Sequence, residues 1–392
     1  MKDNQAKYPQ LRFKGFTDPW EQRKLGEEAQ LTMGQSPNSE NYTKNPDDYI
    51  LVQGNADMKN GRVVPRVWTT QITKKAEKSD LILSVRAPVG DIGKTDYDVV
   101  LGRGVAAIKG NEFIFRQLGK MKLTGYWTRY STGSTFESIN SNDIKDAKIM
   151  VPVEEEQQKI GSFFQQLDHL ITLHQRKLTK LKELKQGYLQ KLFPRNGSKF
   201  LQLRFAGFAD AWEQRKLGDI FSERNERANS GQYKMLSITV DSGIVPADSL
   251  DRKDNSSSDK SHYKRVFEGD IAYNSMRMWQ GASGVSEMNG IVSPAYTVLK
   301  PSKQTDTKFI SYLFKLTSML QSFQKNSQGL TSDTWNLKYK QFSPIKVKIP
   351  ILNEQMKIGK VLEMLDDSIA ANQRKLEKLQ ELKKGYLQKM FC

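Results

Sequence analysis

The sequence predicts an α+β protein with two mixed, strand-rich domains joined by two long helices that form an antiparallel coiled coil with pseudo-two-fold symmetry. Three observations predict this fold. The chain contains an internal duplication, a heptad pattern closes each copy, and short apolar runs bounded by turn residues occupy the rest of each copy.

The duplication is carried by two pairs of matching segments. Residues 11–27 return as residues 203–219 with 13 of 17 positions identical, and residues 175–193 return as residues 373–391 with 15 of 19 identical. Between these segments lie about 150 residues in each copy that differ almost completely. Solenoid repeats recur every ~20 to 50 residues, so this much longer period indicates two whole domains. The predicted boundaries are residues 1–153 for the first variable block, 154–195 for the first helix, 196–351 for the second block and 352–392 for the second helix.

Each copy closes with a long amphipathic helix. Apolar residues recur there at three- and four-residue spacing, with polar interruptions at the same two points of both copies, namely His174 and Lys185, and Asn372 and Lys383. This spacing is typical of a coiled-coil seam whose register is fixed by its polar positions. The predicted seam consists of Ile160, Phe164, Leu167, Ile171, His174, Leu178, Leu181, Tyr188, Leu192, Ile358, Leu362, Leu365, Ile369, Asn372, Leu376, Leu379, Tyr386 and Met390.

The two helices are expected to pair with each other in antiparallel orientation. The link from Phe193 to Lys199 is short, so an antiparallel pair places one block at each end of the helices without a long return segment. At about 1.5 Å per residue, the helix forms a rod of roughly 50 Å. A pseudo-two-fold axis is expected near His174 and Asn372. Pairing of each helix with its copy in a second chain is the alternative.

The variable blocks are predicted to be mostly β. Their apolar runs end at glycine, asparagine and proline clusters, and Pro152 and Pro350 separate the last run of each block from the following helix. Helices are expected at residues 113–123 and 307–323. The predicted strands are residues 49–53, 80–85, 104–109, 146–153, 270–275, 295–300 and 345–351.

Composition favours a nucleic-acid partner. The net charge is +17 and the pI about 9.6, an excess that a polyanion relieves. An anionic membrane surface is the second candidate, but no apolar run approaches the ~18 residues of a membrane span, and the first ten residues lack the apolar stretch of a signal peptide. The single cysteine, Cys392, and three histidines predict no disulfide and no metal site, and they agree with a cytoplasmic location.

Two regions of each block are candidates for contacting DNA. In the first region, a strand ends in an arginine and a glycine-rich turn, which suits phosphate contact or a bidentate bond to guanine; an ordinary turn with a solvated arginine is the alternative. In the second region, residues 131–144 and 328–342 are rich in Ser, Thr and Asn, and a plain polar loop is equally compatible with that composition. The aligned residues of the first region are Arg86, Gly90 and Gly93 in one block and Arg277, Gly281 and Gly284 in the other.

Basic side chains elsewhere in the blocks, among them Arg252 and Lys253, can supply phosphate charge, although each is individually explained as a solvated surface residue. We call the repeated segments at residues 11–27 and 203–219 the markers. They contain Trp20 and Trp212 and are expected to be scaffold that packs against the end of a helix. The DNA-binding candidates are Lys74, Lys75, Arg86, Arg103, Arg129, Ser134, Asn140, Lys264, Arg265, Asn274, Arg277, Gln280, Trp335 and Lys338.

Catalytic signatures are missing from the sequence. The Asn/Asp-Pro-Pro-aromatic tetrapeptide of adenine methyltransferases does not occur, and the nearest string, at residues 45–48, lacks the second proline and the aromatic. There is no Walker A loop and no acidic spacing that singles out a nuclease. The chain is therefore predicted to bind, with no catalytic residue and no cofactor of its own.

The duplicated motifs resemble those of the specificity subunits of type I restriction–modification systems, over essentially the whole chain. Each helix opens with Pro-x-x-x-Glu-Gln, at residues 152–157 and 350–355, and closes with Gly-Tyr-Leu-Gln-Lys, at residues 187–191 and 385–389. Each block opens with Arg-Phe-x-Gly-Phe followed by Trp-Glu-Gln-Arg-Lys-Leu-Gly.

The resemblance implies that each block is a target recognition domain that binds one half of a bipartite, asymmetric site in double-stranded DNA. It implies that the paired helices fix the spacer, since a rod of roughly 50 Å exceeds one ~34 Å turn of B-DNA. It also implies docking of two modification subunits, which use S-adenosylmethionine, and two restriction subunits, which use ATP and Mg. A coiled-coil adaptor with two protein-binding heads and a self-sufficient methyltransferase are the alternatives.

Overall fold

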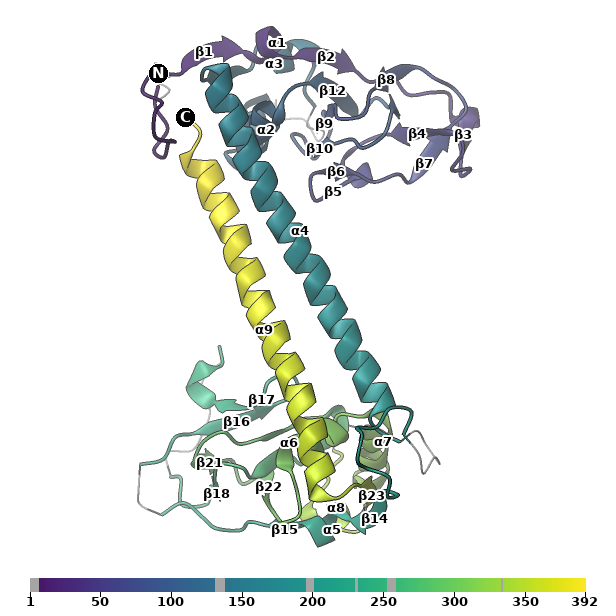
Figure 1. Ribbon diagram of the computed structural model, residues 1–392, viewed down its shortest axis with the longest axis vertical. Helices are drawn as coiled ribbons and strands as arrows, with labels where there is room; N and C mark the ends of the chain where they lie inside the picture. Colours follow the sequence, from purple (N-terminus) through teal and green to yellow (C-terminus); the bar gives the residue numbers. More distant parts are fainter. Residues whose placement is uncertain (1–6, 131–137, 195–200, 230–231, 252–258, 333) are drawn as a thin grey trace. The chain divides into compact units, whose positions relative to one another are not determined.

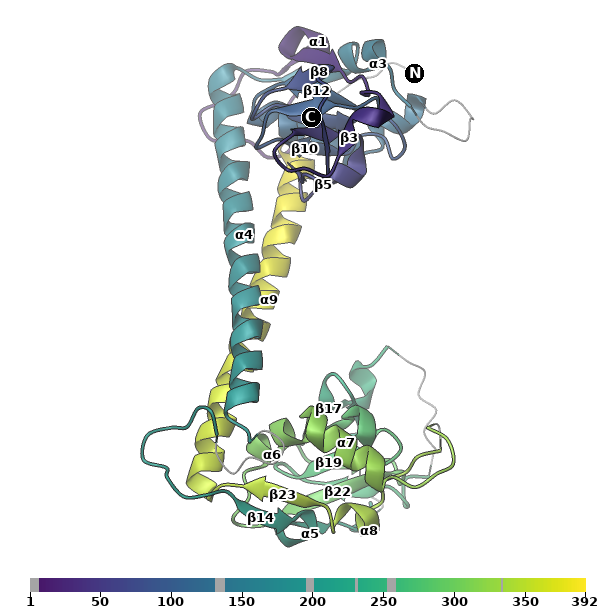
Figure 2. The same ribbon diagram turned by 90° about the vertical axis from the view of Figure 1, so that its right-hand side faces the viewer.

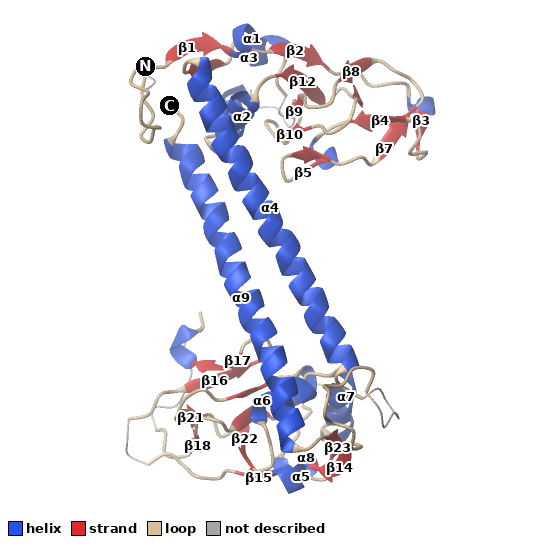
Figure 3. Cartoon of the chain, in the orientation of Figure 1, coloured by secondary structure: helices blue, strands red, loops and turns tan. Residues whose placement is uncertain are grey.

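The structure is a computed structural model that describes residues 7–130, 138–194, 201–229, 232–251, 259–332 and 334–392. The chain forms two compact units. One is assembled from the two ends of the sequence and the other from its middle. Unit 1 comprises residues 1–175 and 374–392, and unit 2 comprises residues 176–373. Each unit therefore holds one strand-rich head and a segment of both long helices (Figure 3). We call residues 7–153 head 1 and residues 201–351 head 2.

Head 1 is built around two sheets. Its strands are β2 (Gln30–Met33), β3 (Tyr42–Thr43), β4 (Tyr49–Val52), β5 (Met58–Lys59), β6 (Arg62–Val63), β7 (Val67–Thr69), β8 (Lys74–Ala76), β9 (Leu81–Ser84), β10 (Ile92–Lys94), β11 (Val99–Leu101) and β12 (Val105–Lys109). One sheet has the order β2-β12-β9-β10-β6-β5 and the other β3-β7-β4-β11-β8. All four residues of β9 are buried, which places this strand in the centre of the head.

The sheets of head 2 have fewer strands each in the described part of the chain. Its strands are β15 (Phe221–Glu223), β16 (Leu236–Thr239), β17 (Gly243–Pro246), β18 (Lys264–Val266), β19 (Ile271–Asn274), β20 (Ser283–Val285), β21 (Gly290–Val292) and β22 (Tyr296–Pro301). The main sheet has the order β15-β22-β19-β20, and β16–β17 and β18–β21 form two-stranded sheets. Figure 2 shows β19 beside β22.

Each head has its own core sheet, and the two sheets have the same strand order although the head sequences differ. The order β2-β12-β9-β10 in head 1 corresponds to β15-β22-β19-β20 in head 2. The turn before the central strand is also the same, because the carboxylates of Asp80 and Asp270 accept the backbone N–H groups of Glu77 and Phe267, at 2.9 Å each. The expected strands are present in both heads, with ends within two residues of the predicted ranges.

A short strand pair joins each head to the start of its long helix. The pairs are β1 (Glu21–Lys24) with β13 (Lys148–Val151), and β14 (Glu213–Lys216) with β23 (Lys346–Ile349). One strand of each pair comes from the repeated marker, and the other ends just before the proline that precedes the helix. Helices α1 (Leu25–Glu28) and α3 (Ser141–Lys145) in head 1 correspond to α5 (Leu217–Ile220) and α8 (Tyr339–Phe342) in head 2.

The helix expected at residues 113–123 is present as α2 (Glu112–Leu123), but the one expected at residues 307–323 is wrong as a single helix. It is divided into α6 (Thr307–Phe314) and α7 (Thr317–Asn326), with extended backbone at Leu316. Phe314 and Phe323 both pack against Phe342, at ring distances of 5.9 and 6.2 Å. Residues nine positions apart lie on opposite faces of one continuous helix, so the break brings both rings to the same partner.

The long helices are α4 (Glu154–Lys191) and α9 (Leu352–Lys389), each of 38 residues. In unit 1 the first turns of α4 meet the last turns of α9, and in unit 2 the last turns of α4 meet the first turns of α9. The helices therefore pair within the chain and run in opposite directions (Figure 1). Each predicted seam residue is buried or half-buried in the structure.

Equivalent ion pairs fix the helix register in both units. Lys383 contacts Asp168 in unit 1, and Lys185 contacts Asp366 in unit 2, each with an N–O distance of 2.5 Å. The two lysines are the polar interruptions of the heptad pattern, and the four residues are equivalent positions of the duplicated helices. Two of the polar interruptions, Lys185 and Lys383, thus join the helices through equivalent ion pairs.

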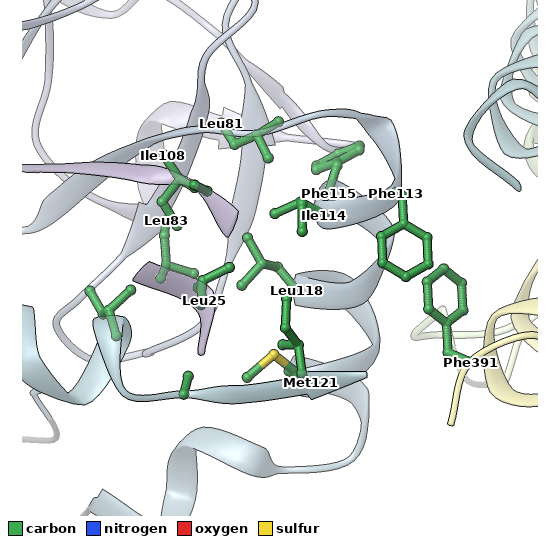
Figure 4. Close-up of a cluster of buried hydrophobic side chains, with 14 of the residues drawn as sticks. Leu25, Leu81, Leu83, Ile108, Phe113, Ile114, Phe115, Leu118, Met121 and Phe391 are labelled. Atoms are coloured by element: carbon green, nitrogen blue, oxygen red, sulfur yellow. The ribbon is translucent and has the colours of Figure 1, made fainter. Parts of the chain in front are cut away.

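The end of each long helix completes the core of the head that begins the other copy. In unit 1, Phe391 stacks on Phe113 at 5.2 Å and meets Trp20 at 6.2 Å. Figure 4 shows the first of these contacts beside the core of head 1. In unit 2, Phe193 stacks on Phe309 at 5.4 Å and meets Trp212 at 6.1 Å. The repeated tryptophans therefore pack against helix ends, as the sequence predicts.

The glutamate of the repeated Glu-Gln pair at each helix start forms a buried ion pair with an arginine. Glu156 is fully buried and accepts two hydrogen bonds from Arg12, at 2.8 and 2.7 Å. Glu354 accepts two from Arg204, at 2.8 Å each. A bidentate guanidinium partner compensates the desolvation of a buried carboxylate. The arginine of each marker is thus tied to the helix that closes the same block.

Candidate nucleic-acid interface

The two regions that the sequence singles out in each block lie side by side in the structure. In head 1, the backbone N–H of Ile139 donates to the carbonyl of Val85 at 3.0 Å. In head 2, the N–H of Leu337 donates to the carbonyl of Ser275 at 2.8 Å. Val85 and Ser275 each follow the central strand of their sheet, so the same two loops meet at the same strand end in both heads.

An exposed arginine occupies this loop in each head. Among the described residues, the side chain of Arg86 makes no hydrogen bond or ion pair, and that of Arg277 is hydrogen-bonded only to Gln280 of its own loop, at 3.2 Å. Both guanidinium groups therefore keep most of their donors available. Such donors match phosphate oxygens or the O6 and N7 acceptors of guanine.

A glycine with positive φ closes the arginine loop in both heads. Gly90 and Gly281 each have φ of +89°, a conformation that side-chain-bearing residues seldom adopt. A Cβ on Gly90 would also lie 2.5 Å from the Trp127 ring. Gly93 and Gly284 then pair with the central strand, at Ile82 and Ala272, which are equivalent positions. The head 2 loop has one extra residue before its arginine, since Arg86 directly follows Val85 whereas Met276 separates Arg277 from Ser275.

The glycine of the arginine loop contacts different residues in the two heads. In head 1 the contact is with the Trp127 ring, in the 3-10 helix η3 (Tyr126–Tyr130). In head 2, Lys315 at the end of α6 donates to the carbonyl of Gly281 and, at 2.9 Å, to that of Val240. Desolvation of the ammonium lowers the pKa of Lys315. The arginine loops of the two heads therefore have the same geometry, whereas the residues that pack against them differ.

Further exposed cations lie near the arginine loop of head 1. The N–H of Val85 donates to the carbonyl of Gly104 at 2.9 Å, which brings Arg103 close to Arg86. Lys74 pairs across β8 and β11 with Leu101, two residues before Arg103. Lys75, also exposed, lies 5.4 Å from the ring centre of Tyr49. Head 1 thus gathers several of the predicted cations at one edge.

The corresponding cations of head 2 are engaged inside the protein. Lys264 and Arg265 on β18 are equivalent to Lys74 and Lys75 on β8, as the strand registers show. Lys264 lies 3.3 Å from Glu223, and Arg265 lies 3.5 Å from Glu226 and stacks on the Tyr233 ring at 4.6 Å. Their half-buried, paired state offers less charge to a phosphate than the exposed lysines of head 1.

Other predicted residues have local structural roles or stand elsewhere. The Asn140 side chain caps α3 by accepting N–H groups of Asn142 and Asp143, and that of Asn274 accepts the N–H of Met276 at 3.0 Å. Trp335 is half-buried and Lys338 is exposed in the loop beside Arg277. Arg129 belongs to η3, and Ser134, Arg252 and Lys253 lie outside the described residues.

Sequence reasoning missed two features, one in the head 2 loop and one on the long helices. Met276 and Trp279 flank Arg277 and Met278 in the head 2 loop, and the aromatic residue in that loop was the available signal. Asp168 and Asp366 each contact a head as well as the opposite long helix, through Arg116 at 2.8 Å and Tyr312 at 2.7 Å. Burial raises the pKa of Tyr312, which keeps its hydroxyl a donor.

Among the described residues, no cluster of three or more His, Cys, Asp or Glu side chains is arranged to hold a metal ion. In the same part of the chain, no helix has the length and apolarity needed to cross a bilayer.

The duplicated heads, each with an arginine loop at the end of its central strand, define a protein with two like binding heads on one helix pair. Comparison with known proteins identifies the family. Residues 17–183 and 209–381 match the type I restriction modification DNA specificity domain, and the chain belongs to that family.

Individual relatives agree with this family. A type I restriction enzyme specificity subunit, MjaX, of Methanocaldococcus jannaschii is 31% identical over 183 residues, which are 45% of this chain and 43% of that protein. The MjaVIII specificity subunit of the same organism is 30% identical over 131 residues, 32% of this chain and 29% of that protein. The matched segments thus span less than half the length of these curated relatives.

The fold matches a solved structure over nearly its whole length. The S subunit of a type I restriction–modification system from M. genitalium superposes with a TM-score of 0.64 and 18% identity, covering 98% of this chain and 99% of that one. This likeness supports the two heads and the pair of long helices.

Proposed function

We propose that this chain is the DNA-binding specificity subunit of a type I restriction–modification enzyme. Each head binds one half of a bipartite site in double-stranded DNA, and the paired helices set the spacer and dock modification subunits. The chain itself performs no chemistry. Methylation of adenine N6 with S-adenosylmethionine belongs to two modification subunits, and ATP- and Mg-dependent cleavage to two restriction subunits.

The observation that carries the proposal is the repetition of one arginine loop in two heads of unlike sequence. Arg86 and Arg277 lie at the same strand end, each beside the second predicted region of its block. A shared loop position with different neighbouring side chains provides the same mode of docking on DNA but different base contacts. The two half-sites are therefore expected to differ in sequence.

Membership in the DNA specificity family supports the choice of DNA as the ligand, and so does the net charge of +17. The antiparallel helix pair supports a fixed spacer, because its register is held in both units by equivalent ion pairs. Two equivalent helix segments also offer two equivalent docking surfaces, which suits two copies of a modification subunit.

The test is a binding selection from random duplex DNA with the purified chain, repeated with a modification subunit present. We expect two short, unlike sequence blocks separated by a constant unspecified spacer, with affinity that falls steeply as salt rises. Methylome sequencing of cells that carry the subunit and its partners should return the same motif. One continuous target, or no salt-sensitive affinity for DNA, would contradict the proposal, and the second result would favour a protein-binding adaptor.

A further inference from the structure

Two tryptophans meet at the surface of head 2, beside its arginine loop. Trp279, in the 3-10 helix η5 (Met278–Gln280), and Trp335 have ring centres 5.2 Å apart in an edge-to-face arrangement of 78°. Both are half-buried, and neither belongs to the main hydrophobic core of head 2, which holds Trp212 and Phe309. We call Met276, Trp279 and Trp335 the indole patch.

The loop anchors itself through a different residue. Met278 is fully buried and faces the core, so η5 is already fixed without its neighbour Trp279. Met276, on the other side of Arg277, is 45% exposed. The loop therefore presents apolar side chains of Met276 and Trp279 at the surface, outside the main core of head 2.

The polar atom of the Trp279 ring is engaged inside the loop. Its Nε1–H donates to the carbonyl of Met276 at 3.1 Å. Indole nitrogen has one hydrogen to donate and no acceptor, so nothing on this ring remains for a hydrogen bond to a ligand. A ligand that contacts this ring therefore meets its carbon atoms, which provide a surface for an apolar group.

Polar donors lie next to this apolar surface. Arg277 directly follows Met276, and its guanidinium contacts Gln280 at 3.2 Å. Arginine recognises guanine and glutamine recognises adenine through hydrogen bonds to the major-groove edge. On that edge, the only apolar substituent among the four bases is the 5-methyl group of thymine. An apolar patch beside an Arg–Gln pair thus matches a thymine next to a purine.

We propose that the indole patch recognises the 5-methyl group of thymine in the half-site bound by head 2, with Trp279 as the specificity-determining residue. This inference rests on the proposed function and adds base chemistry to one half of the site. Arg277 and Gln280 supply the neighbouring hydrogen bonds, and the patch favours thymine over cytosine at this position because cytosine lacks the methyl group.

The experiment replaces thymine with uracil, which removes the methyl group and leaves the hydrogen-bonding edge unchanged. Duplexes carrying the full bipartite site receive one uracil at a time, in either half and either strand, and binding to the full chain is measured. We expect at least one thymine of the head 2 half-site to cost about fourfold in affinity when replaced, the effect of exposing one methyl group. The variant Trp279→Ala should bind the thymine and uracil duplexes equally, whereas Trp279→Phe should keep part of the preference.

Controls separate this inference from the proposed function. Uracil effects in the head 1 half-site should be the same in the wild type and in Trp279→Ala, and Tyr97→Ala, an exposed aromatic of head 1, should leave every uracil effect unchanged. The uracil scan with the wild-type chain does not depend on whether any variant folds. It overturns the inference if no uracil in the head 2 half-site lowers affinity, or if that half-site has no thymine. Persistence of the methyl effect in folded Trp279→Ala also overturns it. Absence of any bipartite site contradicts the proposed function instead.

Discussion

At the scale of single residues, the duplicated motifs have a physical explanation in buried charge. Glu156 and Glu354 lie at the starts of α4 and α9 with side chains that are 0% and 1% exposed, and each is held by one marker arginine. A buried carboxylate without its cation carries an uncompensated desolvation cost, so marker and helix require each other. This requirement accounts for the presence of both motifs in both copies.

Neutralising these carboxylates should destabilise the chain. We expect Glu156→Gln and Glu354→Gln each to lower the free energy of unfolding by about 2–4 kcal/mol, because each substitution leaves a half-buried arginine without its charge partner. Glu21→Gln, in an exposed pair with Arg23, is the matched control and should cost far less, because solvent screens that pair. Urea unfolding followed by circular dichroism measures these values, and equal costs for all three variants would show that the buried pairs are unimportant.

Arg86 and Arg277 should act on separate halves of the site. We expect Arg86→Ala to weaken binding by about 1–3 kcal/mol and to relax base preference only in the half bound by head 1, since a lost bidentate contact affects its own base pair. Arg277→Ala should do the same in the other half. Lys303→Ala, an exposed cation elsewhere in head 2, serves as the control. Binding selection on each variant checks this, and a loss of preference in both halves from one substitution would refute separate reading.

At the scale of secondary-structure elements, the long helices are parts of the heads as well as the connection between them. Phe391 and Phe193 are each 3% exposed and belong to the cores of head 1 and head 2 respectively. Each head is therefore completed by the helix that ends the other copy. Asp168 and Asp366 add a polar link of the same kind, since each contacts its own head and the opposite helix.

Truncating these aromatics should destabilise the two units separately. Phe391→Ala should remove about 3–5 kcal/mol from unit 1, and Phe193→Ala a similar amount from unit 2, because each leaves a cavity among stacked rings. Hydrogen exchange followed by mass spectrometry should show faster exchange in head 1 for the first variant and in head 2 for the second. Leu184→Ala, 47% exposed on α4, should change neither. Loss of protection in the same head for both variants would contradict the assignment of helix ends to cores.

The sequence was informative where structure follows from local pattern. The heptads predicted both helices, the short link between the copies predicted their antiparallel pairing, and strand runs bounded by glycine and proline predicted the core strands. The break between Phe314 and Phe323 could not be foreseen, because the apolar spacing continues through it while the cause is a shared contact with Phe342. Contacts such as Arg12 with Glu156 join residues far apart in sequence, and only the fold shows them.

Among the candidate site residues, the duplication located Arg86 and Arg277 and the loops beside them. The sequence could not distinguish an exposed lysine from a paired one, and Lys264 and Arg265 proved to have acidic partners where Lys74 has none among the described residues. It also could not identify Asn140 as a helix cap, because asparagine suits a cap and a base contact equally well.

At the scale of the whole molecule, the chain is two like units whose heads differ and whose helix segments agree. Divergent loops on a shared core sheet give each head its own surface, and the helix segments preserve the same register in both units. In the proposed function, this division lets half-site sequence change through one head while the spacer stays constant. Adding residues to the helices should therefore alter the spacer and leave both half-site sequences unchanged, as binding selection on such insertions would show.

The most direct measurement is the DNA site selected by a chain in which head 2 is replaced by a second copy of head 1. The account predicts that the half-site of head 1 stays the same, that the other half takes on the sequence of the first, and that the spacer keeps its length. A change in both half-sites, or selection of a single continuous sequence, would contradict independent reading by two heads.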